Sequence, residues 1–126
     1  MGLPGLSSND LTKVKEANDM VDRSFKIAVN CILNRVPFAI ENPFHSLIWE
    51  DGNMCGLSKL PGVQSTRYDF CQFGECYHKK AKILYYSWNL KAEARVCKGH
   101  HGTCSRTGEK HVPLTGAVEC PDDMLH

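Results

Sequence analysis

A repeat of apolar residues at steps of three and four marks the first part of the chain. These residues fall on one helical stripe, and charged residues occupy the opposite side, which is the pattern of an amphipathic helix. Ser, Asn and Asp residues at positions 7–10 offer several N-cap candidates. We therefore predict one long helix over residues 8–34. Its apolar positions are Leu11, Val14, Ala17, Val21, Phe25, Ala28 and Ile32.

The next segment alternates between short apolar runs and breaks. Residues 36–40 form a compact apolar run, which predicts a strand buried on both faces of a helix-flanked sheet. Asn42 is a favoured N-cap and Pro43 a favoured first helical residue, so we expect a helix over residues 44–50. Residues 51–53 then interrupt the pattern, because they are polar and contain glycine.

Two later runs rich in aromatic and aliphatic residues, 66–73 and 82–88, predict antiparallel neighbouring strands. A short helix is expected through Ala92 and Ala94, followed by a segment rich in Gly, Cys and His without periodicity. The order of elements predicts a single partial α/β domain over residues 1–126. Within it we expect a half-sheet over residues 1–90 and a Cys/His-rich tail over residues 91–126.

Composition and charge narrow the class of protein. With 126 residues, 42% of them hydrophobic and 23% charged, the chain suits one globular domain. No apolar run approaches the ~20 residues that span a bilayer, and the first six residues lack signal-peptide features, so we expect an intracellular protein. Residues 79–110 contain eight Lys or Arg and two Glu, a net charge of +6, whereas the rest carries −5. This imbalance favours nucleic acid as a partner.

A basic and aromatic stretch gives that expectation candidate residues. Tyr85, Tyr86 and Trp88 lie along the last predicted strand, and bases could stack on such rings. Packing of these rings in the core is the structural alternative, just as a solvated loop is the alternative for the basic segment. The candidate cations for nucleic acid are Lys79, Lys80, Lys82 and Arg106.

Seven cysteines, an odd number, exclude a complete set of disulfides within one chain and favour reduced thiols. Several of them gather with histidines near the end of the chain, where glycines permit tight turns. Such a group can close a tetrahedral zinc site, although a loop with incidental Cys and His is the alternative. The candidate ligands are Cys97, His100 or His101, Cys104 and His111. Cys71, Cys76 and His78 form a second group that could supply a ligand if the tail folds back.

Three motifs in order resemble the second half of the DNA cytosine-C5 methyltransferase family. They are Phe-Ala-Ile-Glu-Asn-Pro at residues 38–43, Tyr-Asp-Phe-Cys-Gln-Phe-Gly at residues 68–74, and Lys-Ala-Lys at residues 80–82. The likeness is closest to divergent viral and protist members and covers most of the chain. It implies the second half of a doubly wound, Rossmann-like sheet with an antiparallel final strand pair and an irregular Cys/His-rich tail.

The resemblance also implies roles for single residues. Glu41 would match the carboxylate that holds the target cytosine, Asn42 its structural neighbour, and Lys80 and Lys82 would stand where the family usually has arginines. A Glu at the end of a buried strand is suitably placed for this, because it can accept a hydrogen bond from the exocyclic amine of cytosine. The structural alternative is that Glu41 is a partly exposed strand end and Asn42 a helix start.

The chain departs from the family at its two chemical centres. No glycine-rich loop for S-adenosylmethionine and no Pro-Cys nucleophile precede Glu41. We therefore expect a methyltransferase-like fragment that is inactive alone and uses S-adenosylmethionine only if another chain completes it. The alternative is a non-catalytic structural or nucleic-acid-binding subunit, stabilised by zinc. In both cases an open half-sheet predicts a partner protein that covers it.

Overall fold

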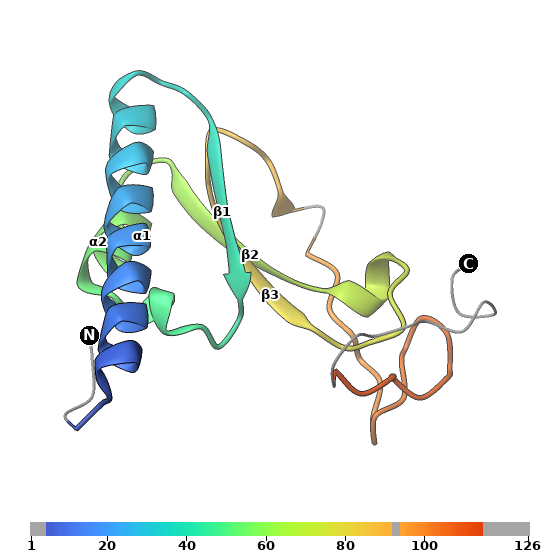
Figure 1. The fold of residues 1–126 in the computed structure, drawn as a ribbon. Helices are drawn as coiled ribbons and strands as arrows, with labels where there is room; N and C mark the ends of the chain where they lie inside the picture. The colour runs from blue at the N-terminus through green and yellow to red at the C-terminus, as the bar shows by residue number, and fades with distance from the viewer. Residues whose placement is uncertain (1–4, 92–93, 115–126) are drawn as a thin grey trace.

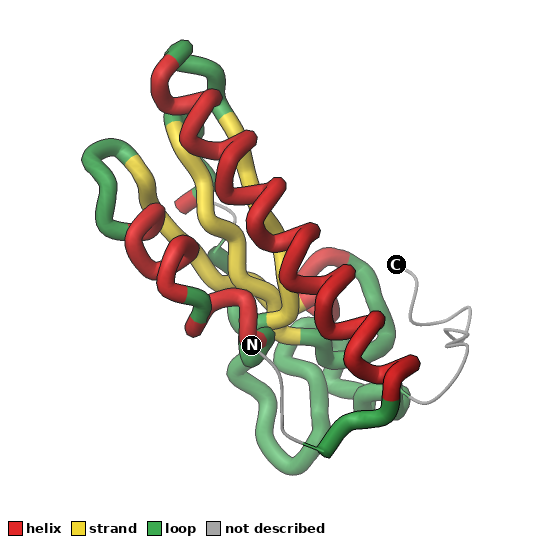
Figure 2. The backbone as a smooth tube through the Cα atoms, turned by 60° about the vertical axis from the view of Figure 1, so that its left-hand side comes forward, coloured by secondary structure: helices red, strands yellow, loops and turns green. Residues whose placement is uncertain are grey.

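The computed structural model describes residues 5–91 and 94–114. In this part of the chain, two helices lie on one face of a three-stranded antiparallel sheet (Figure 1, Figure 2). The chain is therefore of the mixed α/β class. Its elements are helix α1 (Ser8–Leu33), strand β1 (Phe38–Pro43), 3-10 helix η1 (Leu47–Glu50), helix α2 (Gly52–Ser58), strand β2 (Val63–Asp69), 3-10 helix η2 (Phe70–Phe73) and strand β3 (Lys80–Tyr86).

Helix α1 confirms the predicted long amphipathic helix. Ser7 caps its start, because the Ser7 hydroxyl accepts a hydrogen bond from the backbone N–H of Asp10 at 3.2 Å and donates one to the Asp10 carboxylate at 2.7 Å. At the other end, the backbone N–H and side-chain amide of Asn34 both bond to the carbonyl of Asn30. Arg35 then adopts a positive φ of 55°, which turns the chain toward β1.

The sheet has the order β1-β3-β2, with β3 in the centre. The predicted antiparallel pairing of the last two strands is confirmed, with Thr66 opposite Ile83. Strand β1 is also antiparallel to β3, so the described residues contain no parallel pair and no doubly wound half-sheet is seen in them. Residues 70–73, which we expected to extend β2, instead form η2.

Strand β1 differs from the predicted strand in its burial. Phe38 is buried and Ile40 packs against the core, but Ala39 and Glu41 are exposed on the other face. The expectation of a strand buried on both faces is therefore wrong, because both described helices cover the same face of the sheet (Figure 2). The alternation of an antiparallel edge strand explains the observed pattern.

The region between β1 and β2 contains a helix that the sequence pattern did not predict. Residues 51–53 were expected to be a break, yet α2 begins there because the Asp51 carboxylate accepts the N–H groups of Asn53 and Met54 at 3.0 and 3.1 Å. A carboxylate at an N-cap satisfies donors that would otherwise lack partners. Of the expected helix over 44–50, only the 3-10 helix η1 forms.

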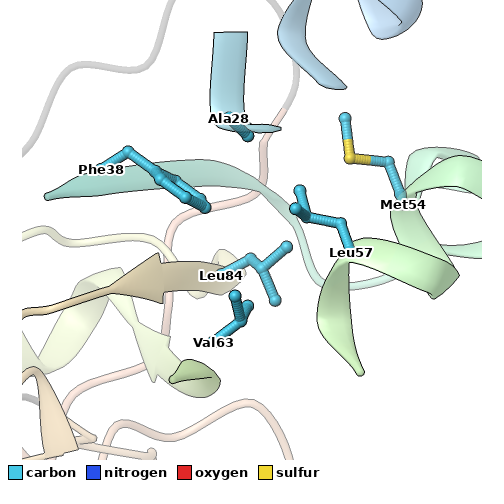
Figure 3. Packing of buried hydrophobic residues seen from close by; sticks show 6 residues of the cluster. All are labelled: Ala28, Phe38, Met54, Leu57, Val63 and Leu84. Atoms are coloured by element: carbon cyan, nitrogen blue, oxygen red, sulfur yellow. The ribbon is translucent and has the colours of Figure 1, made fainter. Parts of the chain in front are cut away.

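The hydrophobic core lies between the two helices and the sheet (Figure 3). Leu57 of α2 and Leu84 of β3 are almost completely excluded from solvent. Val21, Phe25 and Ile32 of α1 add a layer around this cluster. Its buried members are Ala28, Phe38, Met54, Leu57, Val63 and Leu84.

The apolar stripe of α1 continues beyond the sheet. Val14 and Ala17 lie in the N-terminal half of this helix and, together with Leu47 and Ile48 of η1, line a groove of about 960 Å³. Leu11 nearby is 52% exposed. None of the described helices is both long enough and apolar enough to cross a membrane.

The chain after β3 returns along the sheet and forms irregular loops beside η2 (Figure 1). The backbone N–H of Asp69 donates to the carbonyl of Arg95 at 2.8 Å, which fixes the returning segment at the end of β2. The helix expected through Ala92 and Ala94 falls largely outside the described residues. We call residues 94–114 the tail.

Candidate metal site

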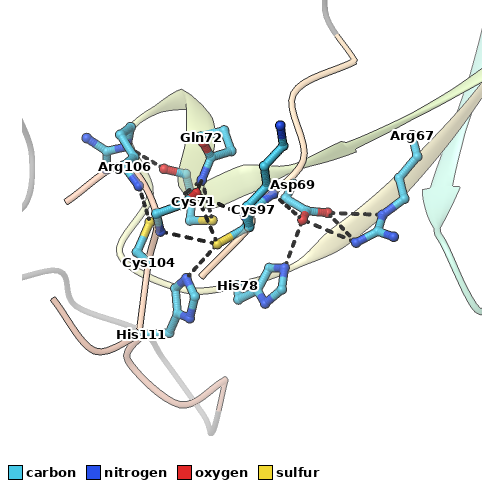
Figure 4. Close-up of polar contacts among 11 residues, drawn as sticks. Arg67, Asp69, Cys71, Gln72, His78, Cys97, Cys104, Arg106 and His111 are labelled. Carbon is cyan, nitrogen blue, oxygen red and sulfur yellow. Dashed lines mark hydrogen bonds and ion pairs between the residues drawn. The ribbon is translucent and has the colours of Figure 1, made fainter. Parts of the chain in front are cut away.

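Four potential metal ligands from two segments, η2 and the tail, meet where the tail contacts η2 (Figure 4). They are the side chains of Cys71, Cys97, Cys104 and His111, whose ligand atoms all lie within 4.8 Å of one another. Cys71 belongs to η2, and the other three belong to the tail. This set is close enough to bind a metal ion.

The position of Cys71 follows from how β2 ends. Strand pairing stops at Asp69, and the chain turns through η2 until Gly74, which has φ +111°. Side chains rarely tolerate this backbone conformation, so glycine suits the end of η2. The turn buries the thiol of Cys71 completely and leaves Gln72 half-buried beside it.

Residues 102–111 of the tail form a tight loop around Cys104, which we call the knuckle. The N–H of Cys104 bonds to the carbonyl of Glu109 at 2.7 Å, and the N–H of His111 bonds to the carbonyl of Gly102 at 2.8 Å. Gly99 lies so close to this loop that a Cβ atom there would come within 1.7 Å of the Thr103 carbonyl oxygen. Only glycine therefore permits this packing of the loop.

Several donors point at the sulfur atoms. The amide of Gln72 donates to Cys71 Sγ at 3.4 Å and lies 3.7 Å from Cys104 Sγ. The N–H of Ser105 donates to Cys97 Sγ at 3.5 Å, and that of Arg106 donates to Cys104 Sγ at 3.4 Å. Such donors stabilise thiolates, and outer groups of this kind orient the ligands of metal sites.

Asp69, the last residue of β2, connects the sheet to the metal-ligand candidate Cys97. Its carboxylate is fully buried and accepts the backbone N–H of Cys97 at 2.8 Å. The same carboxylate contacts His78 Nε2 at 2.9 Å and forms an ion pair with Arg67 at 3.3 Å (Figure 4). Burial alone would raise the pKa of Asp69, but the Cys97 N–H, His78 and Arg67 together lower it. Asp69 is therefore held as a carboxylate.

The surroundings of two thiols push their pKa values apart. Burial would raise the pKa of Cys97, but the N–H groups of Ser105 and Gly99 and the Ser105 hydroxyl lower it to about 6. Burial raises the pKa of Cys71 to about 12, which opposes ionisation in the absence of a cation. A divalent metal ion would supply the positive charge that a cluster of thiolates needs.

His111 completes the group from the tail side. Its Nε2 lies 3.7 Å from Cys97 Sγ, and its ring stacks on that of His78 with centroids 4.8 Å apart. The N–H of the following Val112 bonds to the carbonyl of Cys76 at 2.9 Å, which anchors the end of the knuckle. Asp69 and His111 are thus both in contact with His78.

The prediction of a Cys/His cluster in the tail is confirmed in part. Cys97, Cys104 and His111 converge as expected, and Cys71 joins them because the tail folds back on η2. His100 and His101 do not belong to the group, since both are exposed on the turn before the knuckle. Cys76 and His78, the other expected contributors, lie outside the four-ligand set.

The cations predicted to bind nucleic acid are placed in varied surroundings. Lys79 Nζ lies 4.7 Å from the ring centroid of Phe70, and Lys82 Nζ lies 4.9 Å from that of Trp49. Arg106 Nε donates to the carbonyl of Cys71. Lys80, opposite Asp69 in the sheet register, is half-exposed.

The rings expected to accompany these cations divide between core and surface. Tyr85 is fully buried, and its hydroxyl donates to Gln64 Oε1 at 3.0 Å. Tyr86 packs against the core, whereas Trp88 is 51% exposed. Only Trp88 of the three therefore offers a largely free ring.

Glu41 and Asn42, for which the resemblance implied roles in holding a base, both lie on β1. Glu41 is exposed on the sheet face opposite the helices. Asn42 is half-buried and lines the apolar groove beside α1. The two side chains thus face different sides of the sheet.

Two important residues of the site were not found by sequence analysis. Asp69 carried a signal, because it is an acidic residue between the aromatic residues Tyr68 and Phe70. An Asp that is buried among such residues usually has a partner for its charge. Gln72 offered no signal of its own, since its role depends on the convergence of Cys71 and Cys104.

Comparisons of this chain with protein-family models, with curated proteins and with solved structures found no match.

Proposed function

We propose that this chain is a zinc-stabilised binding module in which Cys71, Cys97, Cys104 and His111 hold a structural Zn²⁺. The convergence of these four side chains from η2 and the tail carries the proposal. Three thiolates and one imidazole suit zinc, which favours tetrahedral sites with sulfur and nitrogen ligands. The donors around the sulfur atoms support the same assignment.

The composition of the tail explains why it requires a metal. Among its residues, 94–114, only Cys104 is buried. Hydrophobic burial therefore contributes little to ordering this segment, and metal binding can supply the free energy instead. The zinc would join the tail to η2 and hence to the end of the sheet.

The ligand set favours a structural over a catalytic role for the metal. Catalytic zinc sites usually keep three protein ligands and leave one position for water or substrate, whereas structural sites use four. All four positions here can be filled by the chain itself. We therefore propose that the zinc holds a binding surface in shape and performs no chemistry.

Native mass spectrometry of the full chain tests the proposal. We expect one zinc ion per chain, and Cys71→Ser should lose it. Cys31→Ser is the matched control, because Cys31 is a free thiol on α1 outside the group and its replacement should leave zinc in place. A metal-free wild-type protein, or equal zinc content in both variants, would contradict the proposal.

The resemblance to cytosine-C5 methyltransferases supports a second proposal, in which a partner chain supplies the cofactor site and nucleophile. In such a complex the base would have to approach Glu41 on the sheet face opposite the helices, where its carboxylate is exposed. Glu41→Gln should then abolish methyl transfer by the reconstituted complex and leave folding intact. Full activity of this variant would remove Glu41 from the reaction.

A further inference from the structure

A small aromatic pocket lies where β2 passes into η2. Its lining consists of Tyr68, Phe70, Phe73 and Glu75, and its volume is about 180 Å³. The Tyr68 ring is nearly parallel to that of Phe70, with centroids 5.4 Å apart, and perpendicular to that of Phe73, with centroids 5.6 Å apart. Three rings and one carboxylate thus line one open site.

We infer that this aromatic pocket binds a methylated ammonium group, such as that of trimethyl-lysine or choline. The faces of aromatic rings attract cations, and cages of such rings recognise quaternary ammonium groups. A trimethylammonium group presents only methyl surface and needs no hydrogen-bond acceptors, so rings satisfy it better than they satisfy a plain ammonium. Glu75 adds a negative charge to the lining.

Two internal contacts show that these rings already interact with cations. Lys79 Nζ lies 4.7 Å from the centroid of Phe70, and Arg95 Cζ lies 5.2 Å from that of Phe73. Neither Lys79 nor Arg95 lines the pocket. A ligand in the pocket would therefore share the rings of Phe70 and Phe73 with these two cations.

Among the described residues, the one charged member of the pocket lining, Glu75, is acidic and favours a cation over a phosphate. Glu75 is part of the lining, and the negative charge of Glu41, after burial, contributes to raising the pKa of the Tyr68 hydroxyl. Two carboxylates beside the rings would repel a phosphate backbone. They also offset the nearby positive charges of Lys79 and Arg95.

The backbone of η2 preforms the pocket. The N–H of Glu75 bonds to the carbonyl of Phe70 at 3.4 Å, and Gly74 provides the left-handed turn between Phe73 and Glu75. Cys71 lies on the same short helix and belongs to the proposed zinc site, so the inference rests in part on the proposed function. Phe73 is 45% exposed, which leaves the pocket open to solvent.

The test uses the full-length protein with its zinc content measured on the same sample. We titrate it with the amide of N-acetyl-trimethyl-lysine, with the unmethylated lysine analogue and with choline chloride at constant ionic strength. Proton NMR of the ligand reports binding inside the pocket, because ring currents shift enclosed methyl protons upfield. We expect this shift for the trimethylated probe and at least tenfold weaker binding for the unmethylated analogue.

Two variants locate the binding site. Phe73→Ala should weaken binding of the trimethylated probe by about tenfold, and Glu75→Gln should weaken it severalfold, both at unchanged zinc content. Trp88→Ala is the matched control, because Trp88 is an exposed ring outside the pocket, and it should leave binding unchanged. Stronger binding of trimethyl-lysine than of choline would indicate a modified peptide as the source, and stronger binding of choline a free or lipid-attached choline group.

Other outcomes would overturn the inference. If protein that contains one zinc per chain caused no upfield shift, the pocket would not bind methylated ammonium groups, and the proposed zinc site would be unaffected by this result. Loss of both zinc and ligand binding would instead place the failure in the proposed zinc site. Binding of a single-stranded oligonucleotide that Phe73→Ala abolishes, without binding of the methylated probes, would assign the rings to base stacking.

Discussion

The carboxylate of Asp69 accepts the backbone N–H of Cys97 at 2.8 Å, and so joins two residues that lie 28 positions apart in the sequence. Asp69 ends β2, whereas Cys97 is the first metal-ligand candidate of the tail. The bond holds Cys97 near Cys71, which lies two residues beyond Asp69. The sheet therefore positions one side of the metal site through a single buried carboxylate.

Replacement of Asp69 by Asn should weaken both zinc binding and folding. Asn keeps the size of the side chain but loses the charge that Arg67 and His78 face. Outer groups of a metal site typically contribute about 10–100-fold to metal affinity, and breaking a buried ion pair costs about 3–5 kcal/mol. Competition with a zinc chelator and denaturant unfolding measure the two effects.

Asp19→Asn is the control for this change, because Asp19 is exposed on α1, away from the tail. We expect it to leave both quantities unaltered. If Asp69→Asn bound zinc as tightly as the wild type, the Asp69–Cys97 bond would have no part in positioning the ligands.

Gly99→Ala should disrupt the knuckle. A Cβ atom at this position would overlap the Thr103 carbonyl, so the loop that carries Cys97 and Cys104 must shift. We expect zinc affinity to fall by about tenfold or more, measured by competition with a chelator. Gly56→Ala, in open space on α2, should keep full zinc affinity and raise stability by up to ~1 kcal/mol. Equal zinc affinity in both variants would show that the loop tolerates the shift.

Substitutions in the hydrophobic core should change the free energy of unfolding without involving the metal site. Leu57 is fully buried between α2 and the sheet, so Leu57→Ala should lower the free energy of unfolding by about 2–5 kcal/mol. Leu47→Ala removes a side chain that is 62% exposed and should change it by less than about 0.5 kcal/mol. Urea unfolding monitored by circular dichroism compares the two. A Leu57→Ala protein as stable as the wild type would refute the assigned core.

As the pH falls, the protein should release zinc before it loses the contribution of the Asp69 carboxylate to the free energy of unfolding. Zinc needs deprotonated thiolates and a neutral His111, so protons compete with it. The pKa of Asp69 is lowered by folding, so its stabilising effect is complete above about pH 4 and is lost as the pH falls through the lowered value. A zinc-sensitive dye and circular dichroism should report two separate transitions, the second reduced in Asp69→Asn. One common transition would contradict this order.

Local patterns in the sequence predicted the local elements. The periodicity of α1 needs no distant contact, so its extent was predicted to within a residue. The ends of the strands were less well predicted, because they depend on pairing and on the turn at Gly74 that converts residues 70–73 into η2. Helix α2 was missed because residues 51–53 look like a break until Asp51 acts as a cap.

The metal site was predicted where its ligands are close in sequence. Cys97, Cys104 and His111 fall within one glycine-rich segment, and their spacing indicated a site. Cys71 is separated from them by the whole of β3, so its selection over His100 or His101 required the tail to fold back on η2. Sequence spacing cannot specify such a long-range approach.

X-ray absorption at the zinc edge tests the central claim most directly, because it reports the atoms bound to the metal. For the purified full-length protein we predict three sulfur ligands at about 2.3 Å and one nitrogen ligand at about 2.0–2.1 Å. In His111→Cys the nitrogen shell should be replaced by a fourth sulfur. A shell of oxygen and nitrogen alone, or protein that takes up no zinc, would contradict the account.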